Sequence, residues 1–323
     1  MVLVLVDHDH AGLDDLSLQA VTFARGLATS VGEPLHALLV GAANGSLAAD
    51  LGEHGVEVAH VASHPQLSGY APVAAARAMA EVIGRTTPSC VVAIGSDQGN
   101  EVMAHLAAII DQPLAADCLE LTVGDPVRVT RSCWGGSLLE EAEVHGSPVL
   151  LTVAPHSTAT AIPGGAAAKV EEFTPNLTEA DLLVQATAES AAATTGVTLA
   201  DAKVVVSGGR GVGGAEGFAV LEELADLLGG AVGCSRVVTS AGWRPHTDQV
   251  GQTGTKVAPE LYIACGISGA TQHLAGCRTS KTMLVINNDP DASILAHADY
   301  AVIGDLHTIL PAIVAETRKA QAG

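Results

Sequence analysis

The segment QVGQTGTKVAPELYIACGISGATQHLAG, residues 249–276, carries the strongest structural signal in the chain. Within it, an apolar run at residues 261–265 is followed by a glycine turn and then by a helical pattern that begins near Ala270. A strand, a turn and a helix in this order are typical of a parallel α/β unit. The segment also supplies hydroxyl, amide and imidazole groups, but no nucleophile beside a base. This set suits the binding of a large cofactor better than the cleavage of a bond.

The same alternation of strand-like and helix-like runs extends over the whole chain. In the first half we expect strands at residues 2–6, 35–40, 56–61, 90–94, 149–153 and 182–188, and helices at 14–29, 71–85 and 100–110. Turn-punctuated alternation at residues 118–144 predicts an antiparallel piece. In the second half we expect strands at 203–207, 261–265, 282–286 and 300–303, and helices at 215–228, from 270, and from 306 to about 319.

These elements predict two α/β domains with mostly parallel sheets, of which the C-terminal one is Rossmann-like. The weak, Ala- and Thr-rich region at residues 190–200 predicts the domain boundary near Thr198. We therefore expect an N-terminal domain at residues 1–197 and a C-terminal domain at residues 198–323. Aromatic residues make up only 2% of the chain, so both cores must be built from Ala, Val, Leu and Ile.

The charge and the cysteines exclude several classes of function. The chain has 15 Lys and Arg against 35 Asp and Glu, a formal charge of −20, which disfavours nucleic acid and anionic membranes as partners. Six cysteines form no CxxC pair or zinc-site spacing, so we expect reduced core cysteines and no metal site. The short apolar N-terminus does not fit a signal peptide, and no apolar run would span a bilayer. The expectation is a soluble cytoplasmic protein.

Two further patterns are weaker. Gly209, Gly211 and Gly214 satisfy GxGxxG after a strand and before a helix, where backbone amides could meet a pyrophosphate. No acidic residue follows at the end of the next strand, which argues against a nicotinamide-binding domain. The run Asp7–His8–Asp9–His10 suggests a metal cluster, but alternate residues at a strand end point in opposite directions, and this favours a surface loop.

Several segments, taken in order, resemble a known family. SGGRGVGG, VGCSR, the segment at 249–276, INNDP and ADYAVIGDL are similar to the FAD domain of electron-transfer flavoprotein alpha subunits. The segments VVAIGSDQGNEVMAHLAAIIDQPLAADCLEL and WGGSLLEE are similar to the N-terminal domain of that family. The resemblance therefore covers essentially the whole chain. It implies one noncovalently bound FAD in the C-terminal domain.

The resemblance also implies roles for individual residues. Thr253 would meet the flavin N5 edge, His273 would donate a hydrogen bond on the O2 side, and Arg236 would place a positive charge beside the ring. The implied cofactor-binding set, with no catalytic residue, is Arg210, Ser235, Arg236, Val250, Gly251, Gln252, Thr253, Ser268, Gly269, Ala270, Thr271, Gln272, His273, Asn287, Asp305 and Leu306.

Some of these residues also have purely structural interpretations. A single histidine after a glycine turn is often a core or helix-capping residue, Thr253 and Ser268 suit turns or N-caps, and Asn287 with Asp289 suits a turn. The family usually has an aliphatic residue at Thr271 and a more apolar loop at residues 244–246. Neither departure removes an implied ligand. Both could shift the flavin potential, so the electron-bifurcating branch of the family stays an alternative.

The resemblance implies an electron carrier rather than an enzyme. It would pass electrons from flavin dehydrogenases, such as those that oxidise acyl-CoA, to a membrane quinone reductase, in a heterodimer with a beta subunit that carries AMP. One alternative is an electron-bifurcating, NADH-oxidising flavoprotein with a second FAD on the partner. Another is a nucleotide-binding regulatory module without a redox role.

Overall fold

The computed structural model describes residues 1–8, 12–41, 45–67, 69–134, 136, 138–186, 197–200 and 202–322. The chain divides into two units, Met1–Ser190 and Ala191–Gly323, which are described separately below. Residues 187–196, where most of the expected linker lies, are outside the described part.

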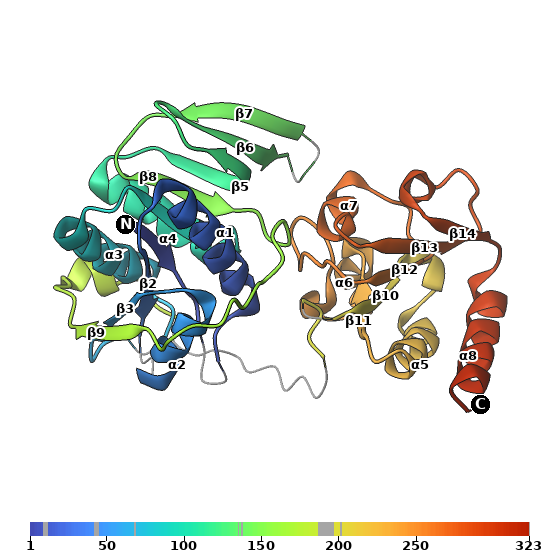
Figure 1. The fold of residues 1–323 in the computed structure, drawn as a ribbon. Helices are drawn as coiled ribbons and strands as arrows, with labels where there is room; N and C mark the ends of the chain where they lie inside the picture. Colours follow the sequence, from blue (N-terminus) through green and yellow to red (C-terminus); the bar gives the residue numbers. More distant parts are fainter. Residues whose placement is uncertain are drawn as a thin grey trace. The chain divides into compact units, whose positions relative to one another are not determined.

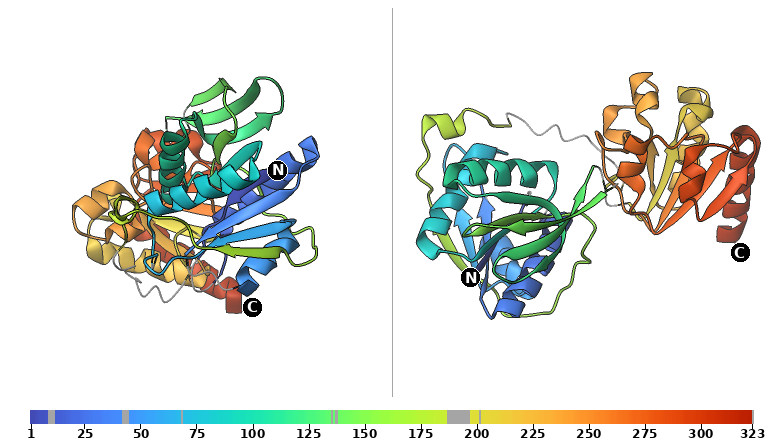
Figure 2. Two further views of the ribbon diagram at one scale, coloured as in Figure 1. Left: turned by 90° about the vertical axis from the view of Figure 1, so that its left-hand side faces the viewer. Right: turned by 90° about the horizontal axis from the view of Figure 1, so that it is seen from above.

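In the described part of the first unit, nine strands form one sheet of order β7-β6-β5-β8-β4-β1-β2-β3-β9 (Figures 1 and 2). The elements are β1 (Val2–Leu5), α1 (Asp15–Val31), β2 (Leu35–Val40), α2 (Gly45–Asp50), η1 (Leu51–His54), β3 (Val58–Ala62), α3 (Pro72–Thr86), β4 (Cys90–Ile94), α4 (Asp97–Ile110), β5 (Leu114–Thr122), β6 (Val127–Cys133), β7 (Leu138–Val144), β8 (Val149–Val153), β9 (Lys169–Phe173) and η2 (Glu179–Leu182).

Two apolar layers cover the two faces of this sheet. Val2 and Val4 of β1 pack in a cluster with α1, whereas Leu3 and Leu5 pack on the opposite face in a cluster with α3 and α4. Alternate residues of a strand point to opposite faces, so a continuous apolar strand is the signature of a sheet buried on both sides. The strand predicted at residues 2–6 is therefore confirmed as β1, which pairs parallel with β2 and β4 and is covered on both faces.

The antiparallel piece predicted at residues 118–144 is confirmed. Strand β6 pairs antiparallel with both β5 and β7, while β5 also pairs parallel with β8 and so joins the piece to the main sheet. Ion pairs between Arg128 and Glu143 and between Arg131 and Glu140 line the exposed hairpin. Cross-strand pairs of opposite charge help to fix the register of such a hairpin.

In the described part of the second unit, five parallel strands form a sheet of order β11-β10-β12-β13-β14. The elements are β10 (Val204–Gly208), η3 (Arg210–Val212), η4 (Ala215–Phe218), α5 (Ala219–Leu227), β11 (Ala231–Cys234), α6 (Arg236–Ser240), η5 (His246–Asp248), β12 (Leu261–Cys265), α7 (Thr271–Cys277), β13 (Thr282–Asn287), η6 (Ser293–His297), β14 (Tyr300–Ile303) and α8 (Leu306–Ala322). Helices α5 and α8 cover one face and α7 the other (Figure 1). The Rossmann-like, mostly parallel fold class is thus confirmed.

Most predicted elements agree with the structure within three residues, and the differences have local causes. Helix α4 begins at Asp97, before the predicted Asn100, because the Ser96 hydroxyl accepts a hydrogen bond from the Gly99 amide at 2.9 Å and caps the helix. The helix predicted at 215–228 begins as the 3-10 turn η4 and becomes α-helical only at Ala219. Strands β9 and β11 and helices α2 and α6 were not predicted. Strand β9 is short and charged, as is typical of an edge strand.

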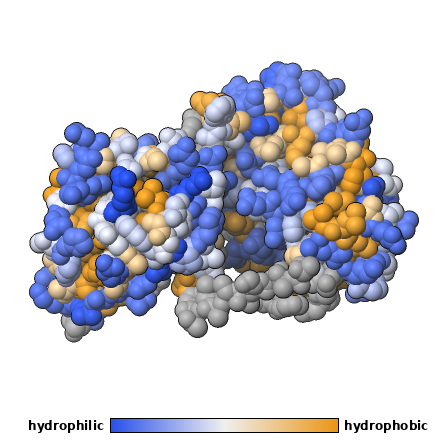
Figure 3. Space-filling model, turned by 180° about the vertical axis from the view of Figure 1, so that it is seen from behind, coloured by the Kyte–Doolittle hydropathy of each residue, from blue (hydrophilic) through white to orange (hydrophobic). Residues whose placement is uncertain are grey.

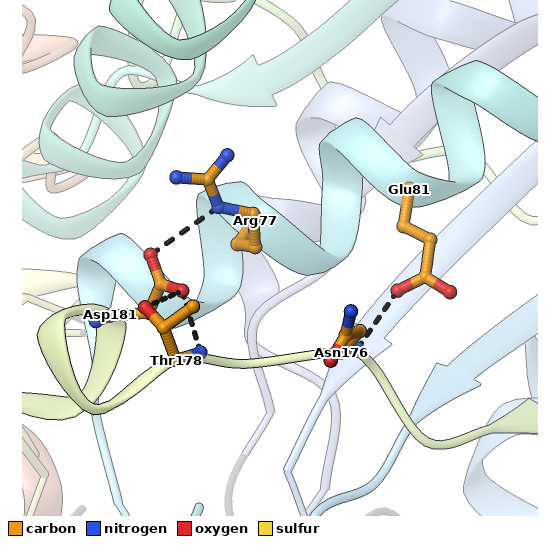
Figure 4. Close-up of polar contacts among 5 residues, drawn as sticks. All are labelled: Arg77, Glu81, Asn176, Thr178 and Asp181. Atoms are coloured by element: carbon orange, nitrogen blue, oxygen red, sulfur yellow. Dashed lines mark hydrogen bonds and ion pairs between the residues drawn. The ribbon is translucent and has the colours of Figure 1, made fainter.

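The strand predicted at residues 182–188 is wrong for the described residues up to 186. The chain turns into η2 there because Thr178 and Asp181 form a capping box: Thr178 donates its amide to Asp181 Oδ2 at 2.9 Å. Figure 4 shows how α3 holds this segment, with Arg77 Nε 3.3 Å from Asp181 Oδ1 and Glu81 accepting from the Asn176 amide at 3.1 Å. These bonds fix a turn where apolar alternation alone predicts a strand.

The surface seen in one space-filling view is largely hydrophilic. Figure 3 shows hydrophilic residues over much of the face seen from behind, with smaller hydrophobic areas between them. No helix in the described ranges is both long and apolar enough to cross a membrane.

The run at Asp7–His10 falls partly outside the described residues, which exclude Asp9 and His10. Among described residues, no group of three or more metal-ligating side chains could hold an ion. Asp7 itself is half-buried, and desolvation, with a smaller contribution from Asp14, raises its carboxyl pKa to about 6. This carboxylate therefore costs stability at neutral pH.

Asp7→Asn should stabilise the first unit at neutral pH. The pKa of Asp7 is about 6 in the folded protein and 3.8 in the unfolded chain. Protonated Asp7 therefore favours the folded state, and the wild-type protein loses this stability as the pH rises from about 4 through about 6. Relative to wild type, the variant should therefore gain roughly 1–3 kcal/mol in unfolding free energy between about pH 4 and about pH 7. Urea titrations at the two pH values measure the difference. Parallel pH profiles for the two proteins would contradict the assignment.

Candidate functional site

A pocket of about 770 Å³ opens in the second unit, where loops leave the carboxyl ends of its strands. Its lining includes Arg210 after β10, Ser235 after β11, Ser268 after β12 and Asn287 at the end of β13. The chain order reverses between β10 and β12, since β11 lies on one side of β10 and β12 on the other. Such a switch point is the usual ligand site of an open parallel sheet, and the volume is in the range of cofactor pockets.

The structure brings most of the predicted site residues together in this pocket. Twelve of the sixteen line it: Arg210, Ser235, Arg236, Val250, Gly251, Gln252, Thr253, Ser268, Ala270, Gln272, His273 and Asn287. Four lie outside the lining: Gly269, Thr271, Asp305 and Leu306. Of these, Asp305 accepts a hydrogen bond from the His307 amide at 3.2 Å at the start of α8, and Leu306 is a core residue. Their ligand roles remain predictions.

The pocket also has lining residues that were not predicted: Gly211, Val237, Ser240, Gln249, Gly266, Ile267, Asn288, Asp289 and Ala292. Most of these are sequence neighbours of predicted residues. Gln249 is different, because it opens the 249–276 segment and yet was not assigned a role. Its buried amide, 2% exposed, could only be recognised from the tertiary structure.

The glycines of GxGxxG serve close backbone packing at the switch point. Gly209 donates its amide to the Cys265 carbonyl at 2.8 Å, and Gly211 donates to the Gly266 carbonyl at 3.1 Å. A Cβ at Gly209 would overlap the Gly266 backbone. Of the three glycines, Gly211 lines the pocket. Since two 3-10 turns precede α5, the motif does not lead directly into a long helix.

The loop at residues 249–257 is held against helix α7 by its backbone. Gln252 donates its amide to the Gln272 carbonyl at 2.7 Å, and Val257 donates to the Gly276 carbonyl at 2.7 Å. A Cβ at Gly276 would overlap backbone atoms of Gly251. Only a helix position without a side chain allows this approach, so Gly276 sets the position of one pocket wall.

Gln249 connects Thr253 to the neighbouring helix. Its amide nitrogen donates to Thr253 Oγ1 at 3.0 Å, while its carbonyl oxygen accepts from Thr239 Oγ1 at 2.7 Å. The Thr253 oxygen accepts this hydrogen bond and donates none to the other described residues, so its hydrogen can be donated to a ligand. A buried glutamine therefore orients the hydroxyl that lines the pocket.

His273 lies in the pocket wall and is 6% exposed. Its Nε2 is 2.9 Å from the hydroxyl of Tyr262, whereas its buried Nδ1 makes no hydrogen bond of good geometry among the described residues. Burial lowers the pKa of His273 to about 4, and an interaction with the Val250 backbone opposes part of this effect. The imidazole is therefore neutral at physiological pH, with one buried nitrogen still to be satisfied.

Two arginines supply positive charge to the pocket. Within the described part of the chain, neither Arg210 nor Arg236 makes an ion pair, and both side chains are exposed. Arg244 makes a useful contrast, because it pairs with Glu222 and, at 2.8 Å, with Asp248 and lies over the Phe218 ring. Unpaired guanidinium groups at a pocket are suited to anionic groups such as a diphosphate.

Comparison with known proteins agrees with this geometry. Residues 2–178 match the electron transfer flavoprotein domain, and residues 198–278 match the electron transfer flavoprotein FAD-binding domain. The electron transfer flavoprotein subunit alpha of Mycobacterium tuberculosis is 38% identical over 333 residues, covering 100% of this chain and 99% of its own length. That of Thermoanaerobacterium thermosaccharolyticum is 35% identical over 322 residues and 98% of each chain. Protein FixB of Clostridium saccharobutylicum is 35% identical over 323 residues, 98% of this chain and 96% of its own.

The chain belongs to the alpha subunits of the electron transfer flavoprotein family. The matched FAD-binding domain covers the pocket from Arg210 to His273. The residues there fit an FAD, since the lining combines two arginines that make no ion pair among the described residues with the Thr253 hydroxyl and the His273 imidazole. The family membership predicted from the sequence motifs is thus confirmed. The pocket lies in the unit that matches the FAD-binding domain.

Proposed function

We propose that the chain binds one FAD noncovalently in this pocket and carries electrons as the alpha subunit of an electron transfer flavoprotein heterodimer. The observation that carries the proposal is the pocket itself. It lies at the switch point of the FAD-binding domain and combines two unpaired guanidinium groups with an oriented hydroxyl and a neutral buried imidazole. No nucleophile with an adjacent base is needed for this role.

The pocket residues would hold the cofactor through different chemistries. Arg210 would neutralise the diphosphate, Thr253 would donate its hydroxyl hydrogen at the N5 edge, and Arg236 would place positive charge beside the ring. His273 would donate an N–H on the O2 side. FAD itself supplies the one- and two-electron chemistry, while these residues set its potential and limit access to it. Asp305 and Leu306 are proposed for the adenosine side.

The cellular role follows from the same proposal. The chain would receive electrons from flavin dehydrogenases, including those of fatty acid beta-oxidation, and pass them to a membrane quinone reductase from the cytoplasm. Its partner would be a beta subunit that carries AMP, contacted by the N-terminal domain at residues 1–197. The FAD domain would extend from residue 198 to residue 323.

An anaerobic reduction assay separates this role from its closest rival. We expect an acyl-CoA with its dehydrogenase to bleach the flavin absorbance of the heterodimer, and NADH alone to leave it unchanged. Rapid reduction by NADH, together with a second FAD, would instead show an electron-bifurcating protein. A well-folded heterodimer without flavin would favour the regulatory module and overturn the proposal.

A further inference from the structure

Behind the pocket wall, a buried hydrogen bond joins His273 to the core. The hydroxyl of Tyr262 lies 2.9 Å from His273 Nε2, and Tyr262, the second residue of strand β12, is 0% exposed. Tyr262 does not line the pocket, whereas His273 does. The two ring nitrogens therefore have different environments, since Nε2 faces the core hydroxyl and Nδ1 is left without a good hydrogen bond among the described residues.

The chemistry of the two groups determines which one donates. Burial raises the pKa of Tyr262 well above its usual value, so its hydroxyl keeps its hydrogen. The imidazole is neutral, so one ring nitrogen carries a hydrogen and the other is an acceptor. A fully buried hydroxyl that did not donate would leave its hydrogen unsatisfied. The arrangement that satisfies it has Tyr262 donating to Nε2, which places the imidazole hydrogen on Nδ1.

Two other side chains lie near the Tyr262 phenol, the Ser207 hydroxyl and the Cys277 thiol. Neither makes a hydrogen bond of good geometry to it in the described structure, and the Cys277 thiol instead donates to the His273 carbonyl at 3.6 Å. His273 Nε2 is therefore the better-placed acceptor, at 2.9 Å. The Val250 backbone, which also interacts with the imidazole and lines the pocket, is consistent with a hydrogen on the opposite nitrogen.

We propose that Tyr262 is a positioning residue that holds His273, a residue of the pocket wall, in the Nδ1–H tautomer, with the imidazole hydrogen on the nitrogen opposite the Tyr262 hydroxyl. The identity of the pocket's ligand as FAD rests on the proposed function, but the tautomer does not. The opposite tautomer would place an N–H against the hydrogen of the buried Tyr262 hydroxyl and would loosen this wall of the pocket. Tyr262 thereby acts on cofactor binding without touching the cofactor.

The tautomer can be measured directly by nitrogen NMR of the full-length chain labelled with ¹⁵N-histidine, with and without FAD. A His273→Ala spectrum identifies the resonances. In wild type we expect an unprotonated Nε2 and a protonated Nδ1 already without FAD. Tyr262→Phe should produce a mixture of tautomers, whereas Ser207→Ala and Tyr300→Phe should not change the spectrum of His273. Predominance of the Nε2–H form in wild type would overturn the proposal, whether or not the variants fold.

A double-mutant cycle tests the consequence for binding. Tyr262→Phe should weaken FAD binding about 3- to 10-fold, as expected for one lost hydrogen bond. The same change in a His273→Ala background should have no further effect, because Tyr262 acts through His273. An equal loss in both backgrounds would show a merely structural role and overturn the proposal. Failure of every protein to bind FAD would instead refute the proposed function, while the NMR result would still decide the tautomer.

Discussion

Gly276→Ala should damage the flavin site severely, although it adds only one methyl group. The added Cβ would overlap the backbone of Gly251, which neither partner can relieve by a side-chain rotation. Moving the 249–257 loop would break the hydrogen bonds from Gln252 to Gln272 and from Val257 to Gly276. We expect a loss of roughly 1–3 kcal/mol in unfolding free energy and the absence of bound FAD after purification.

A matched helix glycine provides the control. Gly84 lies in helix α3, and a Cβ there would meet nothing within 4 Å. Gly84→Ala should therefore raise stability by up to about 1 kcal/mol, as expected from helix propensity, and leave FAD binding unchanged. Denaturant unfolding and flavin absorbance measure both variants. If Gly276→Ala also gained stability and kept its flavin, the close contact between the loop and α7 would be wrong.

His273→Ala should lower the midpoint potential of the bound flavin. The imidazole N–H would donate to the edge of the ring that gains negative charge on reduction, and a hydrogen bond to a charged group contributes about 1–3 kcal/mol. Its loss should destabilise reduced FAD more than oxidised FAD. Anaerobic titration with a redox dye measures the potential of each form.

The exposed His297 of η6 is the control for this change. His297→Ala should leave the potential unchanged. Because burial lowers the pKa of His273 to about 4, the site should also bind oxidised FAD equally well at about pH 6 and about pH 8. An unchanged potential in His273→Ala would contradict the assigned role of the imidazole.

Much of the fold could be predicted because local pattern and tertiary setting agree. Strand β12 begins and ends where its apolar run does, since parallel strands covered by helices are apolar throughout. Strand β14 also matches its apolar run, although its residues are exposed at the edge of the sheet. Strand β9 has a charged sequence and exists only because it pairs with β3 at the sheet edge. Residues 182–186 show the opposite error, because the Thr178–Asp181 capping box overrides an alternating pattern.

The residues of the candidate site were likewise predicted only in part. Motif resemblance found the residues whose side chains reach the pocket, such as Arg236 and His273. It could not find Gln249 or Tyr262, because their roles depend on which hydroxyls and rings the fold brings within hydrogen-bonding distance. Sequence motifs identify the residues that line the pocket. They do not identify the buried residues, such as Gln249 and Tyr262, that hold those side chains in place.

The nucleotide content of the heterodimer tests the central claim most directly. The chain should be coexpressed with its beta subunit, purified, and denatured to release bound nucleotides for identification and counting. We expect a flavin absorbance spectrum and one FAD with one AMP per heterodimer. A folded heterodimer that contains no flavin would contradict the claim that this pocket is an FAD site.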